Sequence, residues 1–187
     1  MRKRLALWFL GRTGWEPEGV RPTEPRFVLI AAPHTSNWDL PYLLALAVVF
    51  DVRVSWMGKH GLFRPPLGWL MRRLGGIPVV RHRRGNLVAQ MARAFGERES
   101  LALVVPAEGT RGYVTHWKSG FYRIAEAARV PIVPTVLDFG RRRVAIGEGF
   151  VPSGSTRSDM DRLRAFYAGS SGRYPDQAGP VRLEDEN

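Results

Sequence analysis

The amino-acid sequence predicts a single α/β domain, in which helices flank a central sheet that is mostly parallel or mixed. Short runs of β-branched and aliphatic residues alternate along the chain with apolar segments of helical length. The chain has 187 residues, 44% of them hydrophobic and 24% charged, which is the length and composition of one folded domain. We expect this domain over residues 26–168, between a basic, apolar segment with a linker (1–25) and a loose tail rich in Gly, Ser, Pro and charge (169–187).

The individual strands are predicted from short buried runs that are bounded by turn-forming residues. The first strand is residues 26–32, and a helix over residues 39–50 follows it. Further strands are predicted over 52–57, 77–80, 101–105, 132–138 and 142–146, and further helices over 67–74, 85–97, 118–128 and 159–166. Because strands and helices alternate, we expect helices on both faces of the sheet.

The chain is strongly basic, with 28 Lys and Arg against 17 Asp and Glu and a net charge of +11. Such a charge favours an anionic partner, which is nucleic acid, an anionic lipid surface or a phosphorylated substrate. The absence of cysteine excludes disulfides, thiolate zinc sites and a cysteine nucleophile, and it is typical of cytosolic proteins. The longest apolar stretch, residues 40–50, is shorter than the ~20 residues of a membrane span and no signal-peptide pattern is present, so we expect no membrane crossing.

The first ten residues combine three cationic side chains with Leu, Trp and Phe, which is the composition of a helix lying on a lipid surface. The same composition fits an N-terminal helix that packs on its own domain. The sequence leaves both alternatives open.

Loops that follow buried strands are the usual ligand-binding positions of an α/β sheet. Directly after the strand 26–32 the chain reads Pro-His34-Thr-Ser-Asn-Trp-Asp39. If the next helix begins near Asp39, His34 lies in the loop and the carboxylate can reach back toward its imidazole. A histidine held by a carboxylate is a candidate general base. The spacing alone is common by chance, so it also fits a polar loop histidine beside an Asp that serves only the helix N-terminus.

The strand 101–105 leads into a second polar loop, Glu108-Gly-Thr-Arg111. Gly109 allows the backbone to approach a ligand closely, Thr110 offers a hydroxyl, and Arg111 presents a guanidinium fork suited to phosphate oxygens. The loop therefore predicts an anion site, although a turn with a solvated Arg has the same residues. Further cations that follow or flank the intervening strands are expected on the same rim: Lys59, Arg64 and Arg81.

At these positions the sequence resembles the lysophosphatidic acid acyltransferase (PlsC-like glycerophospholipid acyltransferase) family. The resemblance covers residues 26–140 and consists of four blocks in the family's order: His34-x4-Asp39, residues 75–81, Glu108-Gly-Thr-Arg111 and residues 130–134. Ala107 precedes the third block, Gly112 follows it where the family usually has Ser, and Pro78 stands in the second block where the family usually has an aromatic residue. The resemblance therefore specifies the reaction class more closely than the acceptor.

The resemblance implies an O-acyltransferase of glycerolipid acyltransferase-like fold. It would move a fatty acyl group from acyl-CoA or acyl carrier protein to a hydroxyl of a lysophospholipid, such as 1-acylglycerol-3-phosphate, in phospholipid biosynthesis. It implies that His34 is the general base and that Asp39 orients it, with no cofactor and no metal. The residues implied in acceptor binding are Lys59, Arg64, Arg81, Glu108, Gly109, Thr110 and Arg111. Together with the basic charge, the resemblance implies a cytoplasmic protein that binds peripherally to the anionic inner face of the cell membrane.

Other functions remain open on the sequence alone. The acceptor is one of several lysolipids, including aminolipids and glycolipids. A hydrolase would use the same His34–Asp39 pair but has no need of a phosphate site beyond that of the thioester carrier. A non-catalytic membrane- or nucleic-acid-binding module would explain the charge but not this pair, and the chain has no recognised nucleic-acid-binding motif.

Overall fold

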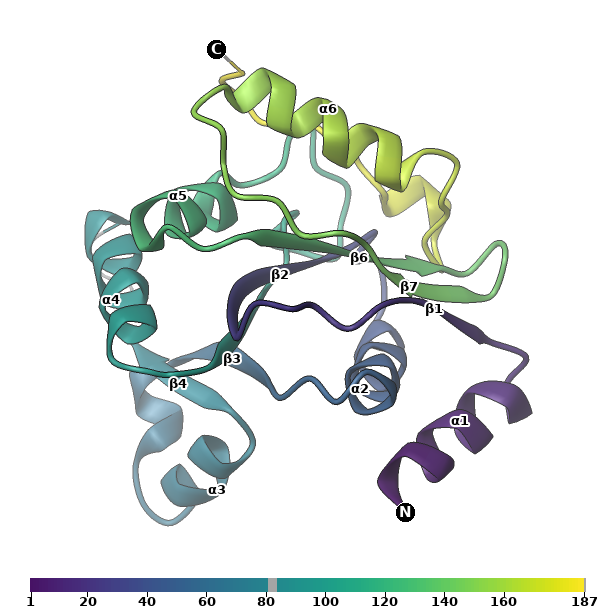
Figure 1. Cartoon of the computed structure of the whole chain (residues 1–187), viewed down its shortest axis with the longest axis horizontal. Coiled ribbons are helices and arrows are strands. Elements are labelled where there is room, and N and C mark those ends of the chain that lie inside the picture. The colour runs from purple at the N-terminus through teal and green to yellow at the C-terminus, as the bar shows by residue number, and fades with distance from the viewer. Residues whose placement is uncertain (81–83, 187) are drawn as a thin grey trace.

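The computed structural model describes residues 1–80 and 84–186 of the chain. Its centre is a seven-stranded sheet in the order β1-β7-β6-β2-β5-β3-β4 (Figure 1). The strands are β1 (Glu16–Gly19), β2 (Arg26–Ala32), β3 (Val54–Lys59), β4 (Gly76–Val79), β5 (Leu101–Val105), β6 (Ile132–Asp138) and β7 (Arg143–Ile146). The helices are α1 (Arg2–Arg12), α2 (Asp39–Val49), α3 (Gly68–Arg73), α4 (Arg84–Gly96), α5 (Gly120–Ala128) and α6 (Thr156–Tyr167), with short 3-10 helices η1 (His60–Phe63) and η2 (Pro175–Gln177). The predicted fold class is confirmed.

Five neighbouring strands, β6, β2, β5, β3 and β4, run parallel to one another, whereas β7 is antiparallel to β6. β1 lies at the outer edge, parallel to β7. The pairing of β2 with β5 runs from Arg26↔Leu101 to Ile30↔Val105. Because parallel neighbours end at the same edge of a sheet, this register brings the loops that follow β2 and β5 side by side.

Strands β2, β5 and β6 have the bounds predicted from the sequence, and the other predicted elements are present with ends shifted by a few residues. β1 was not predicted, because its sequence Glu-Pro-Glu-Gly has a low strand propensity and lies in the expected linker. An edge strand tolerates a proline and exposed charges, since only one of its sides is hydrogen-bonded.

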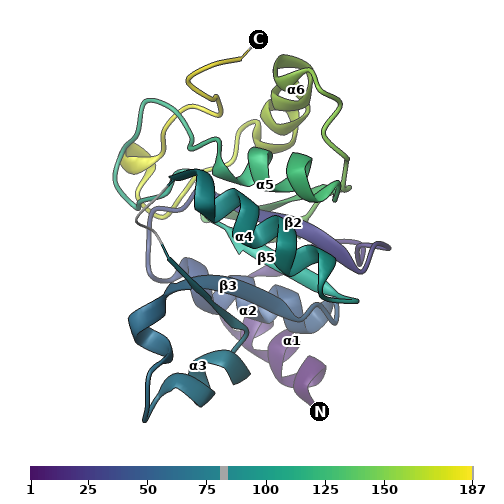
Figure 2. The same ribbon diagram turned by 90° about the vertical axis from the view of Figure 1, so that its left-hand side faces the viewer.

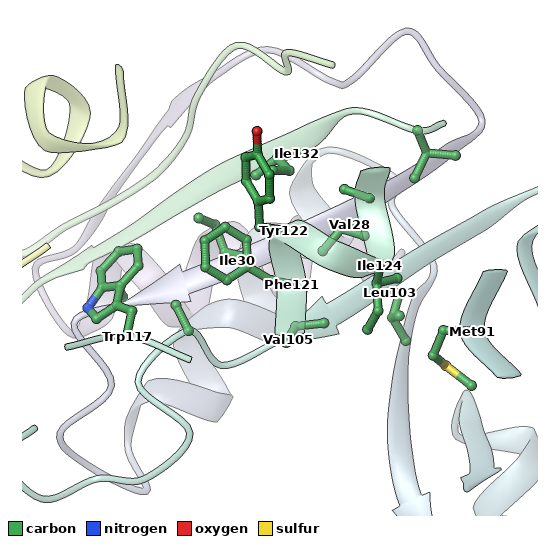
Figure 3. Packing of buried hydrophobic residues seen from close by; sticks show 14 of the residues in the cluster. Val28, Ile30, Met91, Leu103, Val105, Trp117, Phe121, Tyr122, Ile124 and Ile132 are labelled. Carbon is green, nitrogen blue, oxygen red and sulfur yellow. The ribbon is translucent and has the colours of Figure 1, made fainter. Parts of the chain in front are cut away.

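One face of the sheet is covered by α4, α5 and α6 (Figures 1 and 2). Val28, Ile30 and Leu103 point to this face and are fully buried. Phe121 and Ile124 of α5 lie over them (Figure 3). This alternation of side chains along β2 and β5 builds the larger of the two apolar cores.

The opposite face is covered by α1, α2 and the η1–α3 segment (Figures 1 and 2). Leu29 of β2 belongs to the apolar cluster on this side, together with the inner side chains of α2. Trp56 of β3 is paired with Val104, which faces this cluster, and the Trp56 ring lies 6.1 Å from that of Phe63 in η1. The three helical segments therefore form one layer, which we call the α1–α2–α3 layer.

Helix α1 packs on the domain through one side and exposes the other. Ala6 and Leu10 are buried with side chains of α2, whereas Leu5 and Trp8 are exposed. Of the two alternatives drawn from the sequence, packing on the domain is observed, and the outer side of the helix keeps its apolar and cationic composition. Among the residues described, no helix combines the length and the apolar character needed to cross a bilayer.

The C-terminal residues 169–186 differ from the loose tail that the sequence predicts. The backbone N–H of Trp117 donates to the carbonyl of Arg182 at 2.7 Å, and the guanidinium of Arg182 donates to the carbonyl of Thr115 at 2.9 Å. Leu183 is only 5% exposed and belongs to the larger core. The segment is ordered because the side chain of Leu183 fills a place in that core, with Val181 packed against it, and because its backbone is hydrogen-bonded.

Leu183→Ala tests whether this docking contributes to stability. We expect the free energy of unfolding to fall by about 2 kcal/mol or more, because the substitution leaves a cavity in the core. The neighbouring Asp185→Ala is the matched control, since Asp185 is exposed. Urea denaturation measures both variants, and a Leu183→Ala effect within about 0.5 kcal/mol of the control would contradict docking.

Candidate active site

His34 lies near the start of the loop that joins β2 to α2, which we call the His34 loop (residues 33–38), and Asp39 directly follows this loop. The Nδ1 atom of His34 lies 2.9 Å from Oδ2 of Asp39, the first residue of α2. The same Oδ2 accepts the backbone N–H of Ser36 at 3.0 Å. Because an ionised carboxylate only accepts hydrogen bonds, Nδ1 carries the proton in this pair and Nε2 is left to accept one.

Burial separates the roles of the two side chains. The Asp39 side chain is 3% exposed and that of His34 is 29% exposed. Oδ1 of Asp39 is buried and has no hydrogen-bond partner in the described part of the chain, so the contacts at Oδ2 hold the carboxylate. The arrangement presents an accessible imidazole that is oriented from behind by a buried carboxylate, which is the geometry of a general base.

Glu108 connects this pair to the neighbouring strand. Its Oε2 accepts the backbone N–H of His34 at 2.5 Å, and the residue is only 2% exposed. Burial raises the pKa of Glu108 above its ordinary value, while the hydrogen bond from His34 acts in the opposite direction. The contact ties the loop after β5 to the loop after β2. This positioning contact was not anticipated by the sequence analysis, which places Glu108 among the acceptor-binding residues.

Residues 109–113 are exposed in the long connection between β5 and α5, which we call the Arg111 loop (residues 106–119). Gly109 has φ +72°, and a Cβ there would lie 3.1 Å from Cγ of Lys118. Thr110 and Arg111 follow it at the surface, and Arg111 makes no ion pair with the described residues. A guanidinium without an ion pair is suited to an anionic ligand, and the neighbouring Gly109 lets the backbone come close to such a ligand.

Of the remaining predicted cations, Lys59 lies further along the same edge of the sheet. Lys59 ends β3 and Arg64 follows η1, and both side chains are exposed. β5 lies between β3 and β2, so the backbone of Lys59 is about two strand spacings, roughly 10 Å, from the end of β2. Arg64 lies five residues further along the chain, in the η1–α3 segment. No hydrogen bond or ion pair joins either cation to His34, Asp39 or Glu108 within the described ranges. Arg81 lies outside the described residues.

The structure also places residues beside the site that the sequence analysis did not select. Thr35 is 2% exposed, and its hydroxyl accepts the backbone N–H of Tyr174 at 3.3 Å. Gln177 lies between the His34 loop and the Arg111 loop. No sequence signal pointed to Tyr174 or Gln177, because they belong to a segment that resembles a flexible tail and lie far along the chain from the loops they contact. Thr35 lies in the His34 loop itself, but its contact depends on that distant segment.

Glu108→Gln tests the effect of burial on this carboxyl group. A raised folded-state pKa means that the group's contribution to stability is fully present below its ordinary pKa of 4.5 and is lost as the pH rises through the folded-state value. We therefore expect the wild type to lose stability relative to Glu108→Gln as the pH is raised from about 4 to about 8. Urea denaturation at a series of pH values measures this difference, and a difference independent of pH would refute the burial argument.

Comparison with known proteins identifies relatives of this chain. The family model described as Acyltransferase matches residues 17–138, which are more than half of the chain and include the His34 loop. Human 1-acyl-sn-glycerol-3-phosphate acyltransferase beta is 32% identical over 122 residues, which are 62% of this chain and 43% of that protein. The 1-acyl-sn-glycerol-3-phosphate acyltransferase of Limnanthes alba is 29% identical over 138 residues, which are 71% of this chain and 48% of that protein. The chain thus spans about half the length of the curated relatives it matches.

A solved structure supports the fold. The 1-acyl-sn-glycerophosphate (LPA) acyltransferase PlsC of Thermotoga maritima superposes with a TM-score of 0.55 at 21% identity, over 88% of this chain and 73% of that chain. The family match includes the strands β2 and β5 and the His34–Asp39–Glu108 cluster that they bring together. The chain therefore belongs to the Acyltransferase family.

Proposed function

We propose that this protein is an O-acyltransferase that moves a fatty acyl group from acyl-CoA or acyl carrier protein to a hydroxyl of a lysophospholipid such as 1-acylglycerol-3-phosphate. The observation that carries the proposal is the 2.9 Å contact between His34 Nδ1 and Asp39 Oδ2, in a chain of the Acyltransferase family. Both relatives are named for 1-acyl-sn-glycerol-3-phosphate, which supports a phosphate-bearing lysolipid as the acceptor.

In this mechanism Nε2 of His34 removes the proton from the acceptor hydroxyl as the oxygen attacks the thioester carbonyl. Asp39 keeps the imidazole in the required tautomer and stabilises the imidazolium that forms. The tetrahedral intermediate then collapses, the C–S bond breaks, and the thiolate leaves with the proton that His34 returns. Backbone N–H groups near the N-terminus of α2 are suited to stabilise the oxyanion.

Acceptor binding is assigned to the cations at the carboxyl edge of the sheet. An exposed Arg111 without an ion pair among the described residues is suited to a phosphate, and Lys59 lies at the end of β3 on the same edge of the sheet. The sequence resemblance also implies Arg64 and Arg81 in acceptor binding. Holding the phosphate there brings the hydroxyl to His34, which is the proximity part of catalysis. Glu108 contributes to this arrangement because its carboxylate accepts the backbone N–H of His34 and so fixes the position of that residue.

Substitutions at the His–Asp pair test the mechanism. We expect His34→Ala and Asp39→Asn to lower kcat by about 10²- to 10⁴-fold with the fold retained, because a general base and its orienting partner are lost. Purified wild type and variants would be incubated with mixed lysolipids and with acyl-CoA or acyl-carrier-protein donors, and the lipids analysed by mass spectrometry. His116→Ala is the control, since His116 lies outside the His34 loop and its ion pair is with Glu184. Wild-type turnover in His34→Ala would refute the assignment, and thioester consumption independent of acceptor would indicate a hydrolase.

We further propose that the α1–α2–α3 layer binds the surface of an anionic membrane. Of the seventeen large hydrophobic side chains exposed among the described residues, twelve belong to this layer or its helix ends. They are Met1, Leu5, Leu7, Trp8, Trp38, Leu40, Leu44, Val48, Leu62, Leu67, Trp69 and Leu74. Helix α2 contributes a stripe with helical spacing, Leu40, Leu44 and Val48, on the side that faces away from the sheet. Exposed apolar surface of this extent marks an interaction site.

Charge specifies the partner of this layer. The segments α1 and η1–α3 carry exposed cations and no Asp or Glu, and the one acid of α2, Asp39, is buried. The cations are Arg2, Lys3, Arg4, Arg12, Arg64, Arg72 and Arg73. An apolar surface bordered by cations complements anionic lipid. It supports a peripheral position on the cytoplasmic face of the cell membrane, where acceptor lipids lie beside the site.

Vesicle sedimentation tests the membrane proposal. We expect binding to vesicles of phosphatidylcholine with anionic phosphatidylglycerol, rising with the anionic fraction and falling with salt. Leu44→Glu and Trp69→Glu should each weaken binding by about tenfold or more. Each removes apolar area that the membrane would bury, and each adds a negative charge that anionic lipid repels. Val151→Glu is the matched control, since Val151 is a comparably exposed residue outside the layer. Equal binding by all three variants would refute this layer as the contact surface.

A further inference from the structure

We infer that the C-terminal segment 171–178 is a clamp that holds the His34 loop and the Arg111 loop in a fixed relation, with Gln177 as the positioning residue. The inference rests on the proposed function, because it assigns this segment to the acceptor side of the same site. The segment lies outside the region that matches the family model, residues 17–138, so it is argued from the contacts of this chain alone.

The clamp lies directly on the His34 loop. The backbone N–H of Tyr174 donates to the Thr35 hydroxyl at 3.3 Å, and Thr35 is 2% exposed. Gly172 approaches so closely that a Cβ there would lie 2.6 Å from the Thr35 hydroxyl oxygen and 3.3 Å from Cβ of Pro33. A side chain at this position would displace the segment, so the contact requires glycine.

Gln177 joins the two loops through one amide group. With its amide nitrogen facing two carbonyl groups, it donates to the backbone oxygen of Thr35 at 3.1 Å and to that of Arg111 at 2.8 Å. The amide orientation follows from this pair of acceptors, because a carbonyl oxygen placed there would face only other acceptors. The backbone of Arg111 is thereby fixed relative to the residue next to His34.

The clamp is itself anchored at the end of β6. The backbone N–H of Ser171 donates to Oδ1 of the buried Asp138 at 3.2 Å, and the carbonyl of Ser171 accepts the N–H of Phe139 at 2.8 Å. The guanidinium of Arg173 lies 5.5 Å from the centre of the Trp38 ring, at the start of α2. The segment therefore connects the carboxyl ends of β6, β2 and β5, which are neighbours in the sheet.

This connection bears on acceptor binding because Arg111 has an exposed, flexible side chain. Fixing its backbone reduces the number of positions that the guanidinium samples and lowers the entropy lost when it binds a phosphate. The His34–Asp39 pair has separate supports, the Ser36 N–H and Glu108, so loss of the clamp should leave the base in place. The expected signature is weaker acceptor binding with the chemical step retained.

Gln177→Met is the test variant, because methionine has a similar length and lacks the N–H donors. We expect the KM for the lysolipid to rise by about tenfold, as for the loss of two neutral hydrogen bonds, with the donor KM and kcat within about twofold of the wild type. Asp176→Ala is the matched control and should behave as the wild type, since Asp176 is an exposed neighbour with no such contact to either loop.

A second measurement needs no turnover. Amide hydrogen exchange of the purified protein should be faster in Gln177→Met than in Asp176→Ala at residues 109–116, because the Arg111 loop has lost its cross-link. If the wild type transfers no acyl group to any lysolipid, the proposed function fails. The hydrogen-exchange measurement still tests the clamp in that case. Unchanged exchange and unchanged acceptor KM in Gln177→Met would overturn the clamp. A loss of kcat with unchanged acceptor KM would overturn its assignment to the acceptor side.

Discussion

The site depends on the parallel pairing of β2 with β5. The register from Arg26↔Leu101 to Ile30↔Val105 places the last residue of β5 two residues before the end of β2, and the loops that follow meet where the backbone N–H of His34 reaches the carboxylate of Glu108. A slip of one residue would turn the alternate side chains of β2 from one core to the other. The two apolar cores therefore fix the register, and the register fixes the distance between the candidate base and the Arg111 loop.

The buried carboxylates at this edge act on backbone groups as much as on side chains. Glu108 accepts the N–H of His34, Asp39 accepts that of Ser36, and Asp138 accepts those of Gly140, Arg141 and Ser171. Loops that follow parallel strands lose the ladder partners that strands have, so their N–H groups need other acceptors. Buried carboxylates meet that need, and at Asp39 the same atom also orients the imidazole. The same group of buried carboxylates thus holds the loop backbones and orients the His34 imidazole.

The helical layers on the two faces of the sheet differ in their outer surfaces. The face under α4, α5 and α6 holds the larger core, and its helices expose few large apolar side chains among the residues described. The α1–α2–α3 layer buries its inner side in the same way but keeps an apolar and cationic outer side. Helix α2 belongs to both arrangements, because its first residue is Asp39 and its outer stripe faces away from the sheet. The exposed apolar stripe and the carboxylate that orients the His34 imidazole therefore lie on one helix.

The sequence by itself determined the elements with strong local signals and the chemistry within one loop. The bounds of β2, β5 and β6 could be predicted because each is a short apolar run between turn residues. The His34–Asp39 contact could be predicted because one short loop separates His34 from Asp39 at the start of the next helix. Strand β1 and the docking of residues 169–186 had no such signal, since polar edge strands and Gly-rich segments gain their order from partners distant in sequence. Only the tertiary structure decided that Glu108 holds the backbone of His34 and that Gln177 spans two loops. Those contacts join residues far apart along the chain, and their existence depends on strand order and register, which composition and periodicity do not encode.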